Sequence, residues 1–253
     1  MISELMDSFW YKEKEVISLD CMGSEEKKLF QFLENFKNGI FDEKEKFVNF
    51  FTNATDREIY VMGMRIFMSI ARHEDISLLE DFLGECDEEH LSVFLAFVEE
   101  SLSCHTIPYL LALLDTWEET EVAQDIADII CDMLQYESMD EEEYDTEELG
   151  KAYVQFCNTH DLDKYYYCGN EMFLGDLTKE MMLVTMECKS QNETFYTDQI
   201  PSILSNSTGI GCPVSYGVEI TDNIVGQVME YIEKIAKLGQ KRGHKYFYNN
   251  LIG

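Results

Sequence analysis

The sequence contains no lysine or arginine between Arg72 and Lys151, a gap of 78 residues that holds 25 of the chain's 50 acidic residues. The net charge of −31 therefore arises mainly in the middle of the chain, because bases and acids are nearly balanced on both sides of the gap. Non-specific binding to nucleic acid or to an anionic membrane needs a basic surface, so this composition excludes both. The natural complement is a cationic protein partner.

Other absences narrow the class of protein. The 253 residues include only three prolines, and the eight cysteines form no Cys-x-x-Cys pair, which favours buried, reduced thiols. Residues 1–11 lack the basic and apolar regions of a secretory signal, and the apolar run Leu110–Leu114 is far too short to span a membrane. The sequence therefore predicts a soluble, cytoplasmic, all-α protein.

Apolar residues at helical spacing predict folded helices even inside the acidic stretch. The expected helices cover residues 56–71, 75–84, 87–102, 106–115 and 119–135. Capping boxes are expected at Thr55–Glu58 and Thr116–Glu119, and Pro108 suits a first helical turn. The apolar pattern that begins at Ile76 recurs at Ile107, 31 positions later. We expect antiparallel helix hairpins that resemble HEAT repeats and stack as a short solenoid, with an irregular helical bundle as the alternative.

The chain divides by pattern into four regions. They are capping helices in residues 1–54, HEAT-like repeats in 55–136, an acidic loop in 137–149 and a less regular helical region in 150–253. The first region contains an apolar helical stripe that ends at Asn38-Gly39. In the last region, Met181–Met186 suits either a helix or a strand, Gln191–Tyr216 reads as a long loop, and Thr221–Leu238 predicts a final helix. All four regions also fit one continuous domain.

Candidate sites for catalysis or for a bound metal are weak. The Thr208–Gly211 segment has only a Gly-x-Gly, without the third glycine of a dinucleotide loop. Cys157-x2-His160, even with Cys168 or Cys104-His105 added, lacks a fourth zinc ligand at the usual spacing. Asp161-x-Asp163 lacks the glycine and glutamate of a calcium loop. We therefore expect no catalytic, cofactor or metal site.

An acidic stripe beside an apolar one makes residues 119–135 the strongest candidate for binding a partner. Ordinary solvated helices mix charges of both signs, whereas this one carries no base, and neighbouring Trp and Tyr side chains are typical interface anchors. The candidate residues are Trp117, Glu118, Glu121, Asp125, Asp128, Asp132, Tyr136 and Tyr144. A solvated face and, less favoured, a set of acid–base carboxylates are the alternatives. A basic cluster from Lys234 to Lys245 complements the dipole of the final helix and provides a possible internal counterpart to the acids.

The closing segment, residues 239–252, contains Lys245-Tyr246-Phe247-Tyr248 followed by Asn249-Asn250. It resembles a family of immunity proteins from bacterial polymorphic toxin systems, whose members end in Lys-Tyr-Phe-Tyr followed by Gly-His. The resemblance implies a protein that binds and neutralises a cognate toxin without catalysis, and a basic nuclease toxin would suit the acidic face. A HEAT-like adaptor in a protein complex, or an enzyme with its site in residues 151–253, are the other hypotheses. The sequence does not define the oligomeric state.

Overall fold

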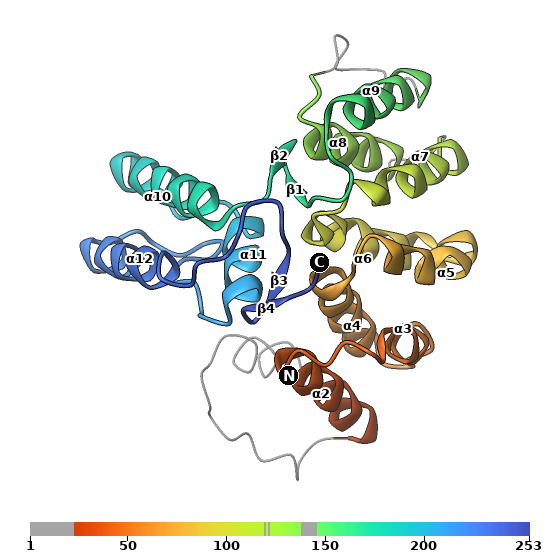
Figure 1. The fold of residues 1–253 in the computed structure, drawn as a ribbon, viewed down its shortest axis with the longest axis horizontal. Coiled ribbons are helices and arrows are strands. Elements are labelled where there is room, and N and C mark those ends of the chain that lie inside the picture. The colour runs from red at the N-terminus through yellow and green to blue at the C-terminus, as the bar shows by residue number, and fades with distance from the viewer. Residues whose placement is uncertain (1–22, 119, 121, 138–145) are drawn as a thin grey trace. The chain divides into compact units, whose positions relative to one another are not determined.

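The computed structural model describes residues 23–118, 120, 122–137 and 146–253 (Figure 1). The chain forms two compact units. The middle unit is Glu43–Met172, and the terminal unit combines the residues up to Asp42 with Phe173–Gly253. None of the helices in the described ranges combines the length and apolar character needed to cross a membrane.

The middle unit is built almost entirely of short helices. Its elements are α3 (Lys44–Thr52), α4 (Arg57–Ile70), the 3-10 helix η2 (Glu74–Leu79), α5 (Glu80–Glu85), α6 (Glu88–Val98), the 3-10 helices η3 (Glu99–Ser101) and η4 (Cys104–Thr106), α7 (Ile107–Thr116), α8 (Val122–Leu134), α9 (Thr146–Thr159) and the strands β1 (Tyr166–Tyr167) and β2 (Asn170–Glu171). The predicted helical class is confirmed. Four of the five predicted helices of this region correspond to α4, α6, α7 and α8 with shifted ends, whereas residues 75–84 form the 3-10 helix η2 and then the short helix α5.

Both predicted capping boxes in the middle unit are wrong. α4 is capped by Asp56, whose carboxylate accepts the backbone N–H of Glu58 at 2.9 Å, because aspartate is a stronger N-cap than the preceding threonine. Thr116 is the last residue of α7 and its hydroxyl donates to the Ala112 carbonyl, so it does not begin α8. The placement of Pro108 in the first turn of α7 is confirmed.

Side-chain contacts within the middle unit repeat at the spacing seen in the sequence. Each joins residues 30 or 31 positions apart: Lys44 with Asp75, Tyr60 with the carbonyl of His90, Ser69 with Glu100, and His73 with Ser103. Residues 44–73 therefore bond to residues 75–103 at positions about one sequence period apart. The curved stack of HEAT-like repeats itself stays a prediction.

The described residues of the terminal unit form four helices and a hairpin. The elements are α2 (Ser24–Lys37), α10 (Leu174–Gln191), α11 (Gln199–Thr208), α12 (Asp222–Ile235), β3 (Tyr246–Phe247) and β4 (Asn250–Leu251). Figure 1 shows α10 beside α12, and α11 packs on both α10 and β3. The predicted stop of α2 at Asn38-Gly39 is confirmed by Gly39 at φ +77°, and the predicted final helix is present with Thr221 as its N-cap. Met181–Met186 lies within α10 and is helical.

The predicted long loop at Gln191–Tyr216 is wrong, because it contains α11. All nine residues of α11 after Gln199 are buried, although five of them are Ser, Thr or Asn. Those residue types usually indicate loops. Here their short side chains bond inside the helix, as when the Thr208 hydroxyl donates to the Leu204 carbonyl at 2.7 Å, so they are buried without losing hydrogen bonds.

Each unit ends in a small antiparallel hairpin of the same form, which no sequence pattern predicted. Tyr166 pairs with Glu171 and Tyr246 with Leu251, so equivalent residues of the two hairpins differ by 80 in number. Both hairpins turn through two residues with positive φ, Cys168-Gly169 and Tyr248-Asn249. This is the geometry of a type I′ turn, which suits the twist of a two-stranded hairpin.

Candidate partner-binding surface

The carboxylates predicted on α8 do share one exposed face of the helix. Asp125, Asp128 and Asp132 are all exposed, while the opposite face of the helix is buried. Gln124 donates from Nε2 to Asp128 at 3.1 Å. Within the described part of the chain, Asp125 and Asp132 form no ion pair with a lysine or arginine. Burial and, after it, the nearby charge of Asp128 raise the pKa of Asp132.

The aromatic residues that flank this face are only partly exposed. Trp117 is half-buried where α7 ends, beside the exposed Glu118. Tyr136 is also half-buried, and its hydroxyl donates to Glu148 at the start of α9, which stabilises the pairing of α8 with α9. Trp117 therefore keeps area for a partner, whereas the polar end of Tyr136 already has one. Glu121 and Tyr144, the other two predicted residues, lie outside the described residues.

Part of the predicted basic cluster is occupied inside the terminal unit. Arg242 pairs with Asp176 at 2.7 Å, and its guanidinium lies 4.5 Å from the ring centroid of Phe173. Lys245 is buried, with only 2% of its surface exposed. Neither side chain is thus a freely extended cation of the kind that the sequence pattern suggested.

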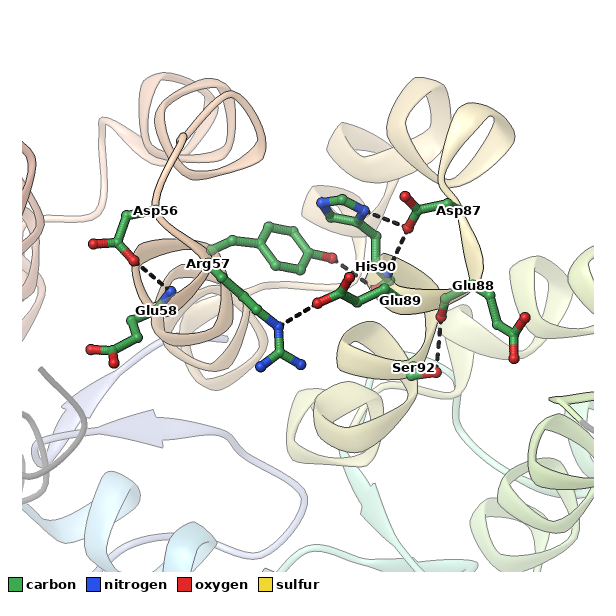
Figure 2. A network of polar contacts seen from close by, with 9 residues as sticks. Asp56, Arg57, Glu58, Asp87, Glu88, Glu89, His90 and Ser92 are labelled. Atoms are coloured by element: carbon green, nitrogen blue, oxygen red, sulfur yellow. Dashed lines mark hydrogen bonds and ion pairs between the residues drawn. The ribbon is translucent and has the colours of Figure 1, made fainter. Parts of the chain in front are cut away.

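A cleft between α4 and α6 was not anticipated from the sequence. Its volume is about 290 Å³, and it is lined by Ala54, Thr55, Arg57, Tyr60, Glu89, His90 and Val93. Figure 2 shows Arg57 and Glu89 pointing toward one another at its edge, where Nε of Arg57 lies 2.5 Å from Oε1 of Glu89. The only sequence signal for the cleft is indirect, namely the spacing of 30 residues that brings Tyr60 to His90.

The polar groups at this cleft do not form a catalytic set. His90 Nδ1 lies 2.6 Å from Oδ1 of Asp87, which also accepts the His90 backbone N–H as the cap of α6 (Figure 2). The nearby Ser92 hydroxyl donates to the Glu88 carbonyl in its own helix. Burial raises the pKa of the Cys86 thiol, which disfavours the nucleophilic thiolate. The pair of Asp87 and His90 therefore orients a helix start rather than activating a nucleophile.

The weak metal and cofactor candidates have structural roles. In the described ranges, no group of three His, Cys, Asp or Glu side chains is placed to hold a metal ion. The His160 ring stacks on Phe156 with centroids 3.9 Å apart. Asp161 accepts the backbone N–H of Asp163 in a local turn. Gly209 ends α11 at φ +70° and lies against the Tyr248 ring, so it is explained by the turn and by close packing.

Among the described residues, the candidate surface that is left is the face of α8. It is acidic, with the partly exposed Trp117 nearby. A sequence model of the family described as Immunity protein 47 matches residues 13–252, which spans both units. The chain belongs to the Immunity protein 47 family. Neither the curated proteins nor the solved structures include a match to it. The resemblance to an immunity protein is thereby confirmed, while the HEAT-like subtype and the family role of the Lys-Tyr-Phe-Tyr segment stay predictions.

Proposed function

We propose that this immunity protein binds a cognate bacterial toxin in the cytoplasm and neutralises it by forming a stoichiometric complex, without catalysing a reaction. The family supports the toxin as partner. The net charge of −31 supports a cationic toxin, because opposite charges accelerate association and favour the correct orientation.

The observation that carries the proposal is the exposed face of α8. Asp125, Asp128 and Asp132 repeat on one side of a helix in a 78-residue stretch that has no base of its own. Repulsion among these carboxylates destabilises the free protein slightly, and a cationic surface would relieve it on binding. If the toxin is a nuclease, the same face competes for the basic site that receives phosphates.

Charge reversal on this face tests the proposal. The double variant Asp125→Lys with Asp128→Lys would be compared with Glu230→Lys with Glu233→Lys, which changes the net charge equally at exposed positions of α12. The probe is the toxin domain encoded immediately beside the gene for this chain, measured by growth rescue on co-expression and by association kinetics at two salt concentrations.

We expect wild-type protein to rescue growth, and the α8 variant to associate at least about tenfold more slowly at low salt with a weaker salt dependence. The association rate of the α12 variant should fall much less, because these positions contribute only to the long-range attraction that follows from net charge. Helicity by circular dichroism should not change in either. Equal rates for wild type and the α8 variant would remove α8 from the interface, and failure of wild type to rescue would remove the proposed function.

A further inference from the structure

Exposed apolar side chains are present on α10 and in the segments that follow it in the terminal unit. Leu183 and Met186 on α10 are 61% and 45% exposed, and Tyr196 and Tyr216 in the segments after it are 53% and 68% exposed. Single exposed apolar residues need no explanation, but a contiguous group of them usually marks a binding surface.

Backbone pairing brings the two tyrosines together. Thr194 bridges Glu219 in antiparallel register, the Phe195 N–H donates to the Val218 carbonyl at 2.9 Å, and the Gly217 N–H donates to the Phe195 carbonyl at 2.8 Å. The Gly217–Phe195 bond places Gly217, at φ +78°, opposite Phe195, so Tyr196 and Tyr216 occupy the next positions of the two antiparallel segments. Between them, Phe195 is fully buried and fixes the pair to the core.

The same tyrosines adjoin the exposed face of α10. The Tyr196 hydroxyl donates to Oε2 of Glu187 at 3.3 Å. Glu187 lies one helical turn after Leu183 and next to Met186, so these side chains occupy neighbouring positions on the helix surface. We call the four exposed residues Leu183, Met186, Tyr196 and Tyr216 the α10 patch.

Acidic side chains surround the α10 patch. Glu180, Glu187, Glu193 and Glu219 are all exposed on its helix and its paired segments. Of the lysines on α10, Lys189 pairs with Asp222, and Lys179 stands one turn before Leu183. The surroundings are therefore mainly anionic, and burial together with the charge of Glu187 raises the pKa of Tyr196 accordingly.

We infer that the α10 patch is a second contact surface for the toxin and receives a segment rich in lysine or arginine. This inference rests on the proposed function and adds an apolar anchor to it. Lysine and arginine carry long aliphatic stems that pack on Leu183 and Met186 while their charged ends reach the surrounding carboxylates. The faces of Tyr196 and Tyr216 attract the same cations.

The backbone pairing supports an energetic role for the tyrosines. Binding is weakened when side chains and loops must first be ordered, and the paired segments are already held by backbone hydrogen bonds. Tyrosine is one of the residue types, with tryptophan and arginine, that are enriched at the energetic hot spots of interfaces. The α8 face would then govern the association rate, and the α10 patch the dissociation rate.

The test is the variant pair Tyr216→Ala and Leu183→Ser, with Val154→Ser on α9 as a matched control of 58% exposure. The probe is again the toxin domain encoded beside the gene. The dissociation rate of the complex would be measured by surface plasmon resonance, and growth rescue would be measured in parallel. We expect each patch variant to dissociate at least about tenfold faster, with thermal stability and association rate little changed. Val154→Ser should behave as wild type.

The possible contrary results are distinct. If wild-type protein neutralises the toxin and both patch variants dissociate from it as slowly as wild type does, the inference is wrong while the proposed function stands. An equal loss in Val154→Ser would also overturn it, because the effect would not be specific to the patch. A wild-type dimer that Leu183→Ser converts to a monomer would assign the patch to a second copy of this chain. If wild type does not neutralise the toxin, the inference fails with the proposed function.

Discussion

Replacing Gly63 by alanine sets two physical effects against each other inside α4. Alanine has the higher helix propensity, which by itself would stabilise the helix by about 1 kcal/mol. A methyl group at Gly63 would, however, overlap Cβ and Cγ of Phe51 in α3 and lie 3.0 Å from its Cδ1. Cβ of Phe51 is fixed to the backbone, so no rotation of the ring removes the overlap, and α3 must move away from α4.

The steric cost should exceed the gain. Overpacking of a core by one methyl group costs about 1–3 kcal/mol, and this site belongs at the upper end because Phe51 is fully buried and has no space to move. The net effect is a loss of about 2 kcal/mol in the free energy of unfolding. For a chain of this size that lowers Tm by about 4–8 °C.

Gly150 provides the matched control in the same unit. It lies inside α9, and an added methyl group meets nothing within 4 Å, so Gly150→Ala should raise Tm by about 1–4 °C through helix propensity alone. Both variants would be measured by calorimetry and by urea unfolding, with the transition of the middle unit followed separately if the two units unfold apart. A Gly63→Ala protein as stable as Gly150→Ala would refute the close approach of α3 and α4.

Two further predictions concern the hairpins and the helix caps. Phe247→Ala removes a fully buried ring from the last hairpin and should cost about 3–5 kcal/mol in thermal or urea unfolding, whereas Leu251→Ala in the same hairpin, at a 55% exposed position, should cost little; equal losses would contradict this packing. In the folded protein, the backbone N–H of His90 holds the pKa of the Asp87 carboxyl below its usual 3.8. Asp87 therefore stabilises α6 fully at any pH above the pKa of the unfolded state, and this stabilisation is lost as the pH falls through the pKa of the folded state. Asp87→Asn should remove that part of the pH dependence between about pH 2 and 5, measured by hydrogen exchange in α6, and an unchanged profile would show that the cap does not form.

Hydrophobic periodicity predicted the helices well and their ends poorly. The helices α4, α6 and α8 each bury one face, and this burial leaves apolar residues at helical spacing in the sequence, so a pattern search finds them. The ends depend on single side chains, such as the choice of Asp56 over its neighbour Thr55 as a cap. α11 was missed because its apolar residues at helical spacing, Ile200, Ile203 and Leu204, cover only its first half, and the rest of its buried surface is Ser, Asn and Thr.

Part of the candidate surface could likewise be predicted from the sequence, and part could not. The shared face of the α8 carboxylates follows from the helical period alone, and Asp125, Asp128 and Asp132 are exposed on it, while their role in binding stays a prediction. The cleft beside Tyr60 and the α10 patch depend on contacts between residues far apart in sequence, which periodicity does not report. Tyr216 in particular sits in a segment that reads only as a polar loop.

The hairpin β3–β4 gives the Lys-Tyr-Phe-Tyr segment a structural explanation that does not require a partner, and the hairpin β1–β2 of the other unit has the same form. The last carbonyls of a helix have no acceptor role inside that helix, so they need outside donors. Gly169 donates its backbone N–H to the Met133 carbonyl at the end of α8, and Tyr248 donates to the Asn206 carbonyl at the end of α11. Both donors come from the positive-φ turn, which aims its backbone N–H groups outward. The same kind of turn thus completes a helix end in each unit, which gives the hairpin that contains Tyr246 and Phe247 a structural role of its own.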